Sequence, residues 1–170
     1  FTIKTKRNEY SAKTVIISTG RKPREMGIPG EQSCKSKGVT YCATCDAPLF
    51  EGKDVVVVGG GHSGLNAVLQ LVNIANKIYL VEDMDNLIAD ERMVEKAKAS
   101  GKVEIFTSAK PKKVCGDGKF VTSFTIEHEG QDKELKVGGV FVEIGYVATE
   151  KPVVEGLDRN EWKEIVVNEK

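Results

Sequence analysis

The sequence predicts an α/β fold in which a βαβ unit with a parallel sheet is followed by an antiparallel β-meander. Asp54–Val58 and Lys77–Val81 are short β-branched or apolar runs separated by a stretch with helical spacing. Parallel strands need such a helical crossover. From residue 112 to residue 137 the pattern changes to alternating strands with glycine-containing turns, which is typical of a meander.

The bulk composition is that of a soluble globular protein. The 170 residues are 40% hydrophobic and 29% charged, which excludes a disordered chain. The 25 basic and 25 acidic side chains balance, so we expect no nucleic-acid partner. No apolar run reaches the roughly 20 residues that span a membrane, and no signal-peptide pattern opens the chain. We therefore expect a cytoplasmic protein without a membrane partner.

The two ends of the chain read as strands. Phe1–Thr5 alternates, a polar turn follows, and Thr14–Ser18 is a second apolar strand. Residues 21–40 are rich in proline and glycine and are predicted to be a connector. Glu164–Asn168 is again a strand pattern. Because the chain starts without methionine in one strand and stops in another, we expect it to be a piece of a longer protein.

The middle of the chain supplies the remaining elements. Ser63–Ala75 carries apolar residues at helical spacing, and Arg92–Ala99 is a charged helix that Gly101 ends. Val103–Phe106 is predicted to be a third parallel strand, and Gly138–Ile144 a further buried strand.

A glycine-rich turn lies between the first strand and the helix of the βαβ unit. The turn has the pattern Gly59-x-Gly61-x-x-Gly64, and the candidate nucleotide-binding residues are Gly59, Gly60, Gly61, His62, Ser63 and Gly64. The first glycine permits a tight turn, the second lets the backbone approach a pyrophosphate, and the third lets helix and strand pack closely. The helix N-terminus adds a positive dipole. The Rossmann-like context on both sides predicts a dinucleotide site.

An acid follows the second strand at the expected distance. Glu82 is placed to accept the ribose hydroxyls of the adenosine half and to repel a 2′-phosphate. No basic residue follows in Glu82–Asp85, so we expect NAD(H) to be favoured over NADP(H). Two alternatives stay open: Glu82 is a solvated strand end, or the neighbouring Asp83 takes this role.

A second motif, Cys42-Ala-Thr-Cys45-Asp46, carries redox chemistry. The spacing brings two sulfurs within bonding reach, and Asp46 can donate and accept the proton that disulfide reduction requires. A zinc site needs two further ligands, and the candidates have no second short-spaced pair, so we expect no metal. These candidates are Cys34, Cys115, His62 and His128. A buried structural pair is the other alternative, and Cys34 and Cys115 are predicted to be unpaired.

Together the two motifs join a two-electron carrier to a dithiol, which points to a pyridine-nucleotide-dependent disulfide reductase. The run Lys37–Lys53 through the dithiol, followed by the turn at Gly59–Gly64, resembles the low-molecular-weight thioredoxin reductases and the flavoprotein component of alkyl hydroperoxide reductase. Tyr79–Glu82 resembles the NADH-using branch. The strand ends at Ser18–Pro23 and Phe141–Gly145 look like the family's two glycine motifs at the domain crossovers.

The resemblance implies a split FAD domain with an inserted nucleotide domain. Residues 1–36 and 150–170 would be partial strands of the FAD domain, and residues 37–149 the NAD(P)H domain that carries the dithiol. The family's flavin-binding GxGxxG and Gly-Asp motifs are not in the chain, so we expect FAD in the intact protein and an inactive isolated segment. Gly145 joins the cofactor-binding candidates. The sequence departs from the family's usual residues at His62 and Asn66.

The resemblance also implies the route of the electrons. Hydride would pass from NADH to FAD and the electrons on to the Cys42–Cys45 disulfide, with Cys45 facing the flavin, Cys42 exchanging with the partner and Asp46 as the acid. The partner would be a thioredoxin-like or peroxiredoxin-type protein disulfide, and the intact enzyme a homodimer. Two other functions stay open: an NADH-sensing module without catalysis, and a metal-binding interaction domain.

Overall fold

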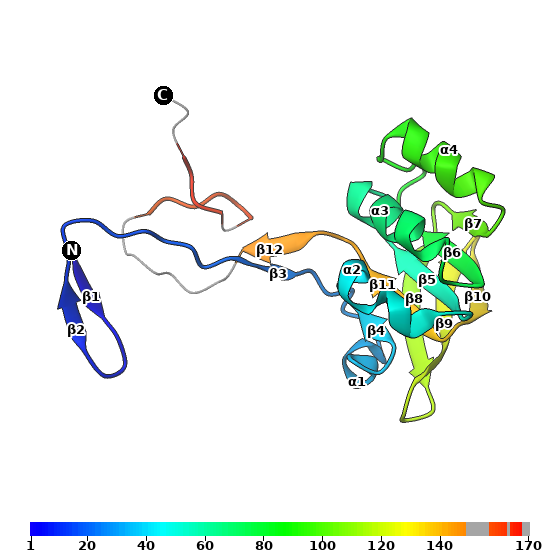
Figure 1. Ribbon diagram of the computed structural model, residues 1–170, viewed down its shortest axis with the longest axis horizontal. Coiled ribbons are helices and arrows are strands. Elements are labelled where there is room, and N and C mark those ends of the chain that lie inside the picture. Colours follow the sequence, from blue (N-terminus) through cyan, green and yellow to red (C-terminus); the bar gives the residue numbers. More distant parts are fainter. Residues whose placement is uncertain (149–156, 163, 168–170) are drawn as a thin grey trace. The chain divides into compact units, whose positions relative to one another are not determined.

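Five parallel strands form the central sheet of the compact unit that residues 23–145 make (Figure 1). The computed structural model describes residues 1–148, 157–162 and 164–167. The strand order is β4-β11-β5-β6-β7, with bounds Val39–Thr40 (β4), Asp54–Val58 (β5), Lys77–Val81 (β6), Val103–Phe106 (β7) and Gly139–Val142 (β11). The bounds of β5, β6 and β7 are those that the sequence predicts, and the α/β fold is confirmed.

Helices cover one face of this sheet. They are α2 (Ala43–Asp46), the 3-10 helix η1 (Ala47–Phe50), α3 (His62–Leu71) and α4 (Glu91–Ala99). Val55 and Val57 of β5 share a buried cluster with Leu65 of α3. Helix α3 ends four residues before its predicted end, because the amides of Ile74 and Ala75 both donate to the carbonyl of Leu71 and turn the chain. No helix in the described ranges is long and apolar enough to cross a membrane.

The meander covers the opposite face. Its strands are β8 (Lys110–Gly116), β9 (Val121–His128) and β10 (Gln131–Lys136), all antiparallel in the order β10-β9-β8, as predicted. Val56 and Val58 of β5 pack in a second buried cluster with Phe124 and Ile126 of β9. Both faces of β5 are therefore buried, which is why its sequence is a continuous run of valines and not an alternation.

The remaining strands form two separate pairs. These strands are β1 (Thr2–Lys4), β2 (Glu9–Ser11), β3 (Arg21–Pro23) and β12 (Tyr146–Ala148), paired as β1-β2 and β12-β3. The predicted strand at Thr14–Ser18 is wrong: Ile16 is 93% exposed, and this stretch has no ladder partner within the described residues. Of the strand predicted at Glu164–Asn168, Ile165 makes one isolated bridge to Arg159, and Asn168 lies outside the described residues.

The predicted connector contains a short helix, α1 (Glu31–Cys34), whose first residue is a buried acid. Glu31 is 1% exposed, and its carboxylate accepts the amides of Met26 and Gly27 at 2.9 and 2.7 Å and the hydroxyl of Tyr41 at 2.8 Å. Burial, and then the hydrogen bond to Glu31, raise the pKa of Tyr41 above its ordinary value. Glu31 thus ties the loop at Met26 to the residue just before Cys42.

Replacing Glu31 with glutamine is expected to destabilise the protein. The amide keeps one acceptor oxygen but turns an NH2 group toward a buried donor, which costs about 1–3 kcal/mol. Urea unfolding followed by circular dichroism measures this difference. The exposed Glu51→Gln is the matched control and should lie within about 0.5 kcal/mol of the parent; equal midpoints for both variants would contradict the expectation.

Candidate nucleotide and dithiol sites

The candidate residues gather where parallel strands end. Thr40 ends β4, while Gly59, Glu82 and Glu143 follow β5, β6 and β11 directly. The carboxyl ends of parallel strands lie at one edge of the sheet, and ligands bind there where the strand order reverses. In this sheet the order reverses at β5, which has β6 on one side and β11 on the other.

The glycine turn is shaped by close backbone contacts. Gly59 has a φ of +113°, and a Cβ there would lie 2.4 Å from the carbonyl oxygen of Glu143. A Cβ at Gly64 would lie 1.7 Å from the carbonyl oxygen of Gly59. At Gly61 the nearest atom would be 3.8 Å away, on Ile88. The first and third glycines therefore close the turn onto strand and helix, while the second leaves backbone free for a ligand's approach.

A pocket opens above this turn. The predicted residues that line it are Gly59, Gly60, Gly61, His62, Ser63, Glu82 and Gly145. Gly64 lies behind the turn against Gly59. The pocket has room at Gly61, the first turn of α3 behind it and an acid on its wall, which together fit a dinucleotide. Arg24 and Glu143 also line the pocket, and the sequence analysis did not single them out.

Glu82 is held in place by the backbone around it. Its two carboxylate oxygens accept the amides of Gly60 and of Met84, the latter at 2.9 Å. Each oxygen keeps lone-pair capacity for a further donor such as a ribose hydroxyl. The carboxylate is therefore tied to the glycine turn while lining the pocket. Asp83 lines the same pocket, so both acids of the sequence analysis are present there.

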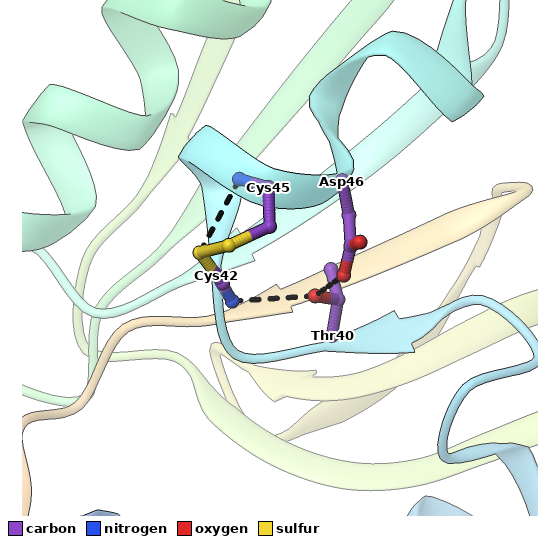
Figure 2. Close-up of a disulfide and its surroundings, with 4 residues drawn as sticks. All are labelled: Thr40, Cys42, Cys45 and Asp46. Carbon is purple, nitrogen blue, oxygen red and sulfur yellow. Dashed lines mark hydrogen bonds between the residues drawn. A yellow bond between two sulfur atoms is a disulfide. The ribbon is translucent and has the colours of Figure 1, made fainter.

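The dithiol motif forms a disulfide at the start of α2 (Figure 2). Cys42 and Cys45 are bonded, with their Cα atoms 5.3 Å apart. Cys42 is the N-cap residue of α2, and its sulfur accepts the amide of Cys45 at 3.2 Å. A helix N-terminus of this kind lowers the pKa of a thiol. The fold therefore provides the stabilisation of a thiolate that the neighbouring carboxylate alone would oppose.

Asp46 reaches the dithiol through a residue that the sequence analysis missed. Figure 2 shows the carboxylate of Asp46 turned toward Thr40, whose hydroxyl donates to it. The same hydroxyl accepts the amide of Cys42 at 3.2 Å. Thr40 thus fixes the acid relative to the backbone of the disulfide. Its position two residues before Cys42, at the end of a two-residue strand, is the signal that could have found it.

The two groups of predicted residues lie in different pockets of the same unit. Cys42, Cys45 and Asp46 line a second pocket together with Tyr41 and Leu49, apart from the glycine turn. Cys34 is buried and free, and Cys115 is partly buried and free, as predicted. The geometry therefore offers a site for a dinucleotide and a separate redox-active disulfide.

Comparison with known proteins agrees with this pair of sites. The sequence model described as "Pyridine nucleotide-disulphide oxidoreductase" matches residues 1–170. The chain belongs to this family. The resemblance drawn from the dithiol and glycine motifs is thereby confirmed. The relatives of this oxidoreductase chain are enzymes that carry a redox function in their names.

Three of these relatives show the range. The chain is 41% identical over 158 residues to "NADH dehydrogenase" of Ferdinandcohnia aciditolerans, covering 92% of the chain and 30% of the relative. It is 46% identical over 136 residues to an alkyl hydroperoxide reductase polypeptide of Xanthomonas campestris pv. phaseoli, covering 79% and 26%. The crystal structure of Lactococcus lactis thioredoxin reductase superposes with a TM-score of 0.90 at 29% identity, covering 99% of the chain and 56% of that structure. The oxidoreductase chain thus spans less than a third of the two curated relatives.

Proposed function

We propose that this chain supplies the NADH site and the redox dithiol of a flavin-dependent disulfide reductase. The observation that carries the proposal is the placement of both groups at the carboxyl edge of one parallel sheet, with the glycine turn after β5 and the disulfide just after β4. Family membership implies FAD and a pyridine nucleotide as cofactors. We assign residues 37–149 to the nucleotide domain and residues 1–36 and 150–170 to parts of the FAD domain.

The residues of the chain divide the chemistry between them. Gly59–Gly64 and Gly145 bind the dinucleotide, His62 and Ser63 line its pyrophosphate side, and Glu82 orients its adenosine ribose. When FAD is bound, it takes hydride from NADH and delivers two electrons to the disulfide. Breaking the Cys42–Cys45 bond with two electrons needs two protons, one of which Asp46 supplies.

The reduced dithiol then exchanges with a partner. The Cys42 thiolate attacks a disulfide in the partner protein, one partner sulfur leaves as a thiolate, and Cys45 resolves the mixed disulfide. The names of the relatives support a thioredoxin-like or peroxiredoxin-type partner, and we expect the intact enzyme to be a homodimer. A nucleotide-sensing module without redox chemistry is not favoured, because the two cysteines are already joined.

The intact protein tests this function. Loaded with FAD, it should reduce a low-molecular-weight disulfide with NADH at about 1–1,000 turnovers per second. The double variant Cys42→Ser, Cys45→Ser should still oxidise NADH with an artificial electron acceptor but should not reduce the disulfide. A double variant that reduces the disulfide as fast as the parent would overturn the proposal.

The nucleotide preference is tested on the chain itself. Because Glu82 would face a 2′-phosphate with like charge, we expect NADH to bind about 10–100-fold more tightly than NADPH, or about 1.4–2.8 kcal/mol. Calorimetric titration with both nucleotides measures this ratio. Glu82→Gln should reduce it toward one, whereas Asp83→Asn, which changes the neighbouring acid, should leave it unchanged. A parent protein that binds both equally, or a larger effect of Asp83→Asn, contradicts the assignment of Glu82.

A further inference from the structure

Glu143 is shared by the two sites. It follows β11 directly, and it lines the nucleotide pocket together with Gly59 and His62. Its carboxylate also accepts the amide of Ala43, the first residue of the dithiol helix α2. The pockets of the glycine turn and of the disulfide are separate, so this half-buried side chain is a direct link between them.

The backbone of Glu143 is fixed against the glycine turn. Its amide donates to the carbonyl of Val58 at 2.8 Å, and its carbonyl oxygen occupies the space that a Cβ at Gly59 would need. The side chain therefore starts from the floor of the nucleotide pocket and ends at the N-terminus of α2. Cys42 is the N-cap residue at that same helix end.

The position places a carboxylate beside the group that becomes a thiolate. Negative charge near a thiolate disfavours it, whereas the free amides of a helix end favour it. Glu143 occupies one of these amides, that of Ala43. An ionised Glu143 therefore opposes the stabilisation that α2 gives to the reduced dithiol.

The surroundings set the pH at which this charge appears. Burial raises the pKa of Glu143 above its ordinary value, while the Ala43 amide acts in the opposite direction. The charged groups that face it are Arg24, His62, Glu82 and Asp83, which line the same pocket, and Asp46 on α2. Because the pKa is raised, Glu143 is neutral at low pH and becomes charged as the pH rises through the raised value.

We propose that Glu143 is a positioning residue that tunes the equilibrium between the Cys42–Cys45 disulfide and its dithiol from the floor of the nucleotide pocket. The proposal rests on the proposed redox function of this pair. In its ionised form Glu143 holds the pair toward the disulfide, which makes the reduced pair a stronger reductant. Removing the charge shifts the pair toward the dithiol.

Equilibration of the chain with dithiothreitol buffers tests the proposal. One dithiothreitol loses two electrons and two protons and closes its own disulfide, while Cys42–Cys45 gains them and opens. At pH 8 we expect Glu143→Gln, which keeps an acceptor for Ala43, to shift this equilibrium about three- to tenfold toward the protein dithiol and to lower the pKa of the first thiol. At pH 5, where Glu143 of the parent is neutral, the two proteins should agree.

The controls separate the possible failures. Glu95→Gln removes an exposed charge on α4 and should match the parent at both pH values. Glu143→Ala removes charge and acceptor together and must shift the equilibrium in the same direction, which keeps the test open if the glutamine variant does not fold. A parent pair that cannot be reduced and reoxidised refutes the proposed function. A reversible pair with no shift in either variant, or with equal shifts at pH 5 and pH 8, refutes the role of Glu143 alone.

Discussion

Replacing Gly64 with alanine should destabilise the protein by about 3 kcal/mol or more, because this substitution places a methyl group inside a backbone contact. The added Cβ would lie 1.7 Å from the carbonyl oxygen of Gly59, so strand β5 and helix α3 must separate. Urea unfolding of the whole chain measures the loss, and calorimetry should show that NADH binding falls with it. Unchanged stability would contradict the close packing of turn and helix.

Gly61→Ala is the matched control from the same motif. Gly61 has a φ of −83°, which alanine adopts freely, and its Cβ would meet only ordinary contacts with Ile88. Stability should therefore change by less than about 1 kcal/mol. The methyl group would instead occupy the surface that a pyrophosphate approaches, so we expect NADH affinity to fall at least about tenfold. The two variants separate a glycine needed for packing from one needed for binding.

The second large effect is expected from Cys45→Ser. The oxidised parent, unfolded without reductant, should expose two thiols, Cys34 and Cys115, and all four after dithiothreitol. Cys45→Ser should expose three thiols under both conditions, because its disulfide cannot form. Its Cys42 should titrate below the ordinary value of about 8.5, since it is the N-cap residue of α2. Thiol counting, mass mapping and a pH titration of alkylation rate measure these changes.

Cys115→Ser serves as the control for thiol counting. It should lower both counts by one and leave the reversible pair of thiols unchanged. A parent that exposes four thiols without reductant would show that the pair is not oxidised in solution. Stoichiometric zinc released on unfolding would favour the metal-binding alternative instead.

The sequence predicts the parts of the fold that local pattern determines. β5, β6 and β7 could be bounded because each is a β-branched or apolar run between turns, with helical spacing before or after it. The strand predicted at Thr14–Ser18 failed because apolar alternation describes only one side of a ladder, whose partner strand the pattern cannot supply. The two-residue strand β4 and the four-residue helix α2 are too short to show any period.

The site could be predicted one motif at a time but not as an arrangement. The glycine turn, Glu82 and the cysteines are recognised by their spacing along the chain, and the structure places the first two in one pocket. Thr40 and Glu143 escape this reasoning because their roles depend on β4 lying beside β11, which are about a hundred residues apart in the chain. Long-range pairing of this kind is what a single sequence leaves undetermined.

The position of β4 at the rim of the sheet has an evolutionary consequence. This strand contacts only β11, whereas the nucleotide turn follows the central strand β5. Substitutions, insertions or loss of the redox group at the rim can therefore accumulate while the interior strands keep the dinucleotide pocket intact. In this architecture the electron acceptor is a replaceable attachment and the nucleotide platform is the inherited part, so a lineage can change what it reduces without rebuilding how it binds its cofactor.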